Sequence, residues 1–111
     1  MYSRKLDGSL NLDLLVAARR HGFSAQAPPG TPALVKEYLL RGVPVIALVR
    51  SRPGSEQFHF LVVIGFDDEA EEFTVHSGRT AGERIGYREF ARSWKPSGNW
   101  MLVVERKKDW P

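Results

Sequence analysis

The apolar stretch QFHFLVVIGFDD, residues 57–68, constrains the fold of this chain more than any other segment. Side chains of a β-strand alternate between two faces, so even-numbered and odd-numbered residues would separate. The first set is Phe58, Phe60, Val62 and Ile64, and the second is His59, Leu61 and Val63. Both sets are apolar apart from His59, which predicts a strand in the interior of a sheet. A buried imidazole requires a hydrogen-bond partner or a chemical role, and a core histidine bonded to backbone is the simpler interpretation of this residue alone.

Length and composition indicate one soluble globular domain with a modest core. The chain has 111 residues, of which 42% are hydrophobic and 26% charged. Its net charge of +3, from 16 basic and 13 acidic residues, is too small to indicate nucleic-acid binding. No apolar run is long enough to cross a bilayer, and residues 1–8 contain no apolar signal segment.

The chain contains no cysteine. Disulfides, thiolate metal sites and a cysteine nucleophile are therefore excluded within these 111 residues.

The remaining pattern predicts an α+β domain. Helices are expected over 9–21, over 32–41 after a Thr31 cap, and from 86 onward. Extended segments are expected over 23–27, 43–49, 57–66, 72–78 and 99–105. Residues 79–84 are expected to form a loop. Three strands follow one another with short links, so the sheet should be mainly antiparallel, with helices on at least one face. The acidic turn at 67–71 is expected to be a solvated hairpin tip.

Two histidines fall on neighbouring predicted strands. If the hairpin turns near Asp68, His59 and His76 lie nearly opposite each other at its open end. A histidine with a polar partner on the adjacent strand is the arrangement of a general base and the residue that orients it, and Ser77 is the other candidate partner. A zinc site is disfavoured because no third ligand is apparent, so no metal or other cofactor is expected. No serine-nucleophile motif and no glycine-rich phosphate loop occur either.

Several of these segments, in this order, resemble a known family. Residues 42–49 and 59–67, then Tyr87-Arg88-Glu89-Phe90 with Trp94, and finally 100–104, are similar to the histidine half of the bacteriocin-processing cysteine peptidases. Those are papain-like enzymes that cut after double-glycine leader peptides. The sequences of residues 8–22 and 76–78 resemble a stand-alone bacterial branch of such peptidase-like proteins. The whole resemblance spans about residues 8–105.

The resemblance implies a papain-like fold whose N-terminal, cysteine-bearing part is missing. It makes His59 the catalytic base. The orienting residue of the family is an aspartate or asparagine at the end of the next strand, where this chain has His76 or Ser77. The domain organisation expected on this basis is a lead-in over 1–8, a peptidase-like domain over 9–105 and a polar tail over 106–111.

The leading functional hypothesis is a partial peptidase domain that is inactive alone because it lacks the nucleophile. The alternative is a non-catalytic module that holds an extended peptide in the same groove. Nucleic-acid binding ranks last, because the three tryptophans stand at core-like positions or in the tail. The expected partner is a peptide substrate or leader peptide. Absence of the cysteine helix would also leave an apolar face near His59 and Leu61, through which the chain would associate with itself.

Overall fold

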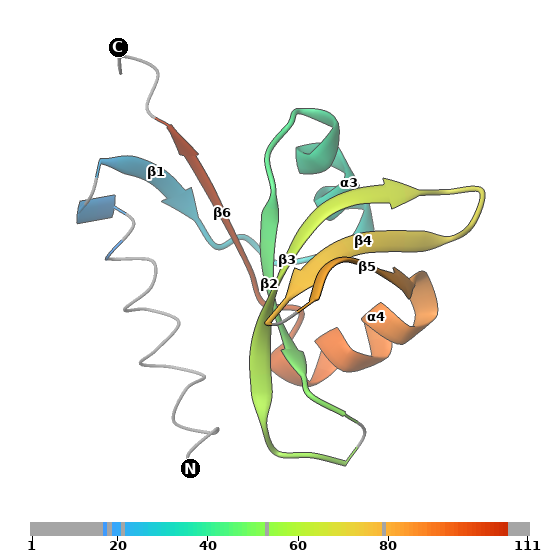
Figure 1. Ribbon diagram of the computed structural model, residues 1–111. Helices are drawn as coiled ribbons and strands as arrows, with labels where there is room; N and C mark the ends of the chain where they lie inside the picture. The colour runs from blue at the N-terminus through green and yellow to red at the C-terminus, as the bar shows by residue number, and fades with distance from the viewer. Residues whose placement is uncertain (1–16, 18, 21, 53, 79, 107–111) are drawn as a thin grey trace.

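A computed structural model describes residues 17, 19, 20, 22–52, 54–78 and 80–106 of the chain. Its centre is a six-stranded sheet with the strand order β1–β6–β2–β3–β4–β5, and each neighbouring pair is antiparallel (Figure 1). The strands are β1 (Phe23–Gln26), β2 (Val45–Arg50), β3 (Phe58–Asp67), β4 (Glu72–Ser77), β5 (Thr80–Gly86) and β6 (Met101–Arg106). The helices are α3 (Pro32–Leu40), α4 (Tyr87–Trp94) and the short 3₁₀ helix η2 (Lys95–Ser97). The predicted α+β class is confirmed.

Helices α3 and α4 pack on one face of the sheet. The buried cluster on that face joins Val35 of α3 and Phe90 and Trp94 of α4 to strand residues Val45, Ala47, Val49, Leu61, Val63, Phe73, Val75, Met101 and Val103. The rings of Phe90 and Trp94 have centroids 5.0 Å apart, and Phe73 continues this aromatic row at 5.0 Å from Phe90. Helical spacing predicted this contact, because residues four apart share one side of a helix.

The start of α3 follows its sequence signals. The Thr31 hydroxyl accepts a hydrogen bond from the Leu34 amide at 3.0 Å, and Pro32 occupies the first turn. Val35 is fully buried, and Leu34, Tyr38 and Leu39 pack beside it, as predicted. The helix gives way to Gly42, whose φ of 78° suits glycine.

Strand β3 is interior to the sheet, as predicted, but its two faces differ. Leu61 and Val63 are buried, whereas Ile64 is 42% exposed, so the expected burial of both faces is wrong at that residue. A bulge between Val63 and Gly65 leaves Ile64 without a partner on β4. Beyond the bulge Phe66 pairs with Phe73 and packs against the core, although simple alternation would place it on the other face.

Strand β5 corrects the expected loop over 79–84. It forms an edge of the sheet, and its residues from Thr80 to Arg84 are exposed. An exposed edge strand needs no alternating apolar residues, so the polar sequence TAGER carried no pattern that would predict a strand.

The acidic turn is hydrogen-bonded to α3 and α4. Asp68 accepts hydrogen bonds at 2.7 Å from the Lys36 ammonium of α3 and from the Tyr87 hydroxyl of α4. The side chain of Asp68 remains 66% exposed, in agreement with a solvated hairpin tip.

The lead-in over 1–8 and most of the first predicted helix lie outside the described residues. At the end of that helix, Gly22 has a φ of 86° and its amide donates to the Arg19 carbonyl at 3.1 Å, as expected of a helix terminus. Strand β6 extends to Arg106, one residue beyond the predicted end of the last strand. Across the ranges given above, no helix has the length and apolar character required to cross a membrane.

Candidate functional site

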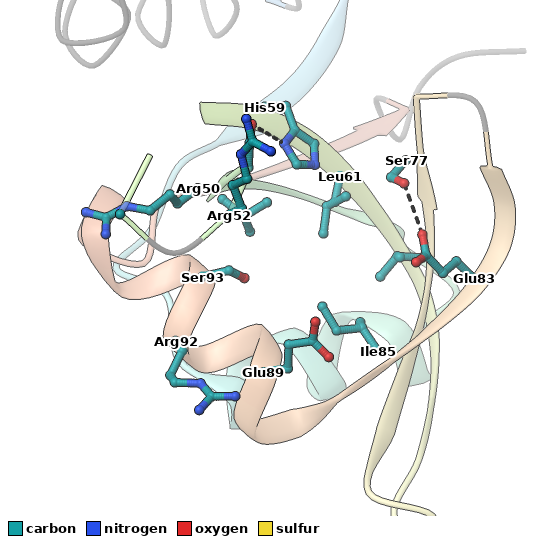
Figure 2. Close-up of a pocket in the computed structure, with 14 residues that line it drawn as sticks. Arg50, Arg52, His59, Leu61, Ser77, Glu83, Ile85, Glu89, Arg92 and Ser93 are labelled. Carbon is teal, nitrogen blue, oxygen red and sulfur yellow. Dashed lines mark hydrogen bonds between the residues drawn. The ribbon is translucent and has the colours of Figure 1, made fainter. Parts of the chain in front are cut away.

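A cavity of about 760 Å³ lies on the helix-covered face, between α4 and the strands β2 to β5 (Figure 2). Apolar side chains of Val49, Leu61, Val75 and Ile85 contribute to its wall. Around them stand polar residues: Arg50, Ser51, Arg52, His59, Ser77, Glu83, Glu89, Arg92 and Ser93. An apolar wall with polar groups at its edge is the usual composition of a ligand site.

His59 is placed in this cavity by β3, on the same face as Leu61 and Val63. Its Nδ1 lies 3.1 Å from the hydroxyl oxygen of Ser51, the residue that follows β2. Burial lowers the pKa of His59 below its ordinary value of 6.5, and the nearby charge of Glu83 partly offsets this effect. The uncharged imidazole is therefore favoured, which is the form that a general base requires.

Ser77 also faces the cavity. It lies opposite Leu61 across the β3–β4 pair, which puts it on the same face as His59. Its hydroxyl donates to a carboxylate oxygen of Glu83 at 3.2 Å (Figure 2). The structure thus brings together two of the three candidate residues, His59 and Ser77, and adds a carboxylate from β5.

Glu83 was not predicted as a site residue, because residues 79–84 were expected to form a loop. The signal that could have found it is weak: Gly78 sits between two polar segments, as in a tight hairpin. Glu83 pairs with Val75 across β4 and β5, and this register turns its side chain toward the cavity.

The predicted pairing of His59 with His76 is wrong. His76 lies opposite Val62, on the other face of the sheet from His59. Asp67 pairs with Glu72, so the turn is centred two residues later than a His59–His76 pair requires. The bulge at Ile64 then moves the register back by one residue, which leaves an odd net shift. The Nδ1 of His76 accepts a hydrogen bond from the Gly82 amide at 3.0 Å, so this side chain supports the β4–β5 hairpin.

An exposed apolar face was expected at Leu61, and this prediction is wrong. Only 4% of this residue is exposed, because it belongs to the buried cluster on the helix-covered face of the sheet. It is therefore unavailable as an anchor for a second copy of the chain.

The charges at the rim of the cavity are not paired with one another. The ion pairs found in the described ranges join Lys36 to Asp68, Arg41 to Glu105 and Arg84 to Glu72, all outside the cavity lining. Among those same residues no group of three or more histidine, aspartate or glutamate side chains is arranged to hold a metal ion.

Comparisons with known proteins agree with this architecture. The model of the Peptidase_C39 like family matches residues 19–101. The crystal structure of a C39-like peptidase from Bacillus anthracis superposes with a TM-score of 0.68 at 14% identity, covering 83% of this chain and 56% of that one. The peptidase domain of Streptococcus ComA, a bifunctional ABC transporter of a quorum-sensing pathway, superposes with a TM-score of 0.69 at 18% identity, covering 96% of this chain and 77% of that one.

These likenesses establish the fold. This chain spans little more than half the length of the Bacillus anthracis protein. Among curated protein sequences, none matches this chain. The expected papain-like cysteine peptidase fold is confirmed, and the matched residues 19–101 cover most of the sequence. The chain therefore belongs to the peptidase C39-like family.

Proposed function

We propose that this chain is the histidine-bearing part of a C39-like peptidase domain, which holds a peptide in the cavity beside His59 and does not cleave it alone. The observation that carries the proposal is the position of His59 at a cavity with an apolar base, within a fold of this family. Ser51, which contacts the imidazole, and Ser77, which also lines the cavity, supply hydroxyl groups but no thiol.

His59 has the properties of the base in such a reaction. In a cysteine peptidase the imidazole takes the thiol proton and later gives a proton to the departing amine. A depressed pKa keeps His59 uncharged and able to accept that proton at neutral pH. Because the chain has no cysteine, the thiolate for this chemistry would have to come from outside these 111 residues.

Ser77 and Glu83 are the candidates for orienting His59. Ser77 occupies the end of β4, and its hydrogen bond to Glu83 holds a carboxylate on the same side of the cavity. The domain that carries the site is taken as residues 9–105. The substrate class that the family resemblance favours is a double-glycine leader peptide of a bacteriocin-like precursor.

The test combines binding with hydrolysis. The chain is incubated with a double-glycine leader peptide, cleavage is followed by mass spectrometry, and binding is followed by the NMR signals of the His59 ring. We expect a change in the His59 signals without any cleavage, and His59→Ala should weaken binding. His76→Ala is the matched control, because that side chain lies on the other face.

Two outcomes would overturn the proposal. One is cleavage by the chain alone that disappears in His59→Ala, since it would reveal a nucleophile other than a thiol. The other is the absence of any peptide binding at the His59 face. Self-association is a separate prediction, for which sedimentation over a concentration series is the measurement.

A further inference from the structure

The charged residues of the cavity are sorted by sign around its rim. Arg50 and Arg52 come from the end of β2 and the loop after it, and Arg92 from the last turn of α4. Glu83 comes from β5 and Glu89 from the first turn of α4. Figure 2 shows the arginines along one side of the cavity and Glu83 on the opposite side, with Glu89 between Arg92 and Ile85.

The three arginines do not converge on a single point. Their guanidinium groups extend in different directions in Figure 2. A single phosphate or sulfate would be held by groups that meet around it, usually as bidentate contacts. Separate positive charges along a rim instead suit several carboxylates spaced along an extended chain.

Arg50 contributes its positive charge to this rim, while its Nε atom is buried and has no hydrogen-bond partner among the residues that the structure describes.

We infer that the cavity selects an extended peptide by charge order. Acidic side chains of the peptide lie along Arg50, Arg52 and Arg92, an apolar side chain lies against the half-buried Ile85, and a basic side chain lies toward Glu83 and Glu89. This inference rests on the proposed function and specifies the class of peptide that the site binds.

The experiment uses three end-blocked, fluorescently labelled peptides of equal length. One has two glutamates, leucine, glycine and two lysines in that order, the second has the reverse order, and the third replaces all charged residues by glutamine. Binding to the full chain is measured by fluorescence anisotropy at low and high salt. We expect one charge order to bind about tenfold more tightly than the other two peptides, which corresponds to about 1.4 kcal/mol. Screening at high salt should reduce this preference.

Matched variants locate the effect. Arg92→Glu should remove most of the preference, whereas Arg88→Glu should preserve it. Arg88 is an exposed residue of the same helix that does not line the cavity. Circular dichroism of both variants checks that they remain folded.

The outcomes separate this inference from the proposed function. If all three peptides bind equally and His59→Ala weakens each of them, charge selection is wrong and the proposed peptide site stands. An equal loss in Arg92→Glu and Arg88→Glu would also contradict charge selection at the cavity. If none of the peptides binds, both the inference and the proposed function fail.

Discussion

His76 lies opposite Val62 on the β3–β4 hairpin, so its side chain projects from the other face of the sheet than that of His59. One histidine lines the cavity, and the other accepts a hydrogen bond from the Gly82 amide in the next hairpin. The two histidines therefore have different roles, and the effects of replacing each one should be distinguishable by experiment.

Replacing His76 by alanine should lower stability without changing the cavity. The lost hydrogen bond to the Gly82 amide corresponds to about 0.5–1.5 kcal/mol of unfolding free energy, with the smaller value favoured because His76 is exposed. Urea unfolding measures this loss. A perturbation of the His59 NMR signals as large as that caused by a ligand would show that the two faces are not independent.

Acidification should destabilise the protein through His59. Its folded pKa is lowered by burial, so the unfolded chain binds a proton at a higher pH than the native chain does. Stability contributed by uncharged His59 is present above the ordinary pKa of 6.5 and falls as the pH drops below that value. Thermal melting between about pH 5 and 8 should show a smaller loss of stability at acid pH for His59→Gln than for the parent chain. An identical pH dependence of the two proteins would contradict the assignment.

Gly30 should not tolerate a side chain. A Cβ atom there would collide with the Asn99 carbonyl oxygen and approach the Trp94 ring to 2.5 Å. Neither neighbour can move freely, because Trp94 is buried and bonds the Trp100 carbonyl at 2.8 Å. We expect Gly30→Ala to cost about 3 kcal/mol or more of unfolding free energy, measured by urea denaturation.

Gly65→Ala is the control for that experiment. The nearest atom to a Cβ at Gly65 is the Thr74 Cβ at 3.9 Å, an ordinary contact. This variant should match or slightly exceed the parent in stability, because alanine restricts the unfolded chain more than glycine does. A similar loss in both variants would mean that crowding at Gly30 is not the cause.

The N-terminus of α3 provides a test of local capping. Thr31→Ala removes the acceptor for the Leu34 amide and should cost about 1 kcal/mol of unfolding free energy. Thr31→Ser keeps the hydroxyl and should cost much less. Chemical denaturation of both variants distinguishes loss of the cap from loss of the methyl group.

Much of the fold could be predicted because its signals are local. The Thr31 hydroxyl accepts a hydrogen bond from a first-turn amide of α3, and Pro32 has no amide N–H that needs a partner. The spacing of Phe90 and Trp94 fixes the buried side of α4. The apolar run from Phe58 to Val63 identifies an interior strand whatever its neighbours are. Strand β5 escaped prediction because an exposed edge strand carries no such apolar pattern.

The site depended on information that no single segment contains. His59 could be identified from its strand, but its neighbours in the cavity depend on the turn length and on the bulge at Ile64. Because side chains alternate with a period of two, an odd shift in register moves a residue to the opposite face. That shift separated His76 from His59 and placed Ser77 beside the cavity, and the β4–β5 pairing brought in Glu83. The sequence by itself determined the strand that carries His59, whereas only the pairing of strands in three dimensions decided which residues surround it.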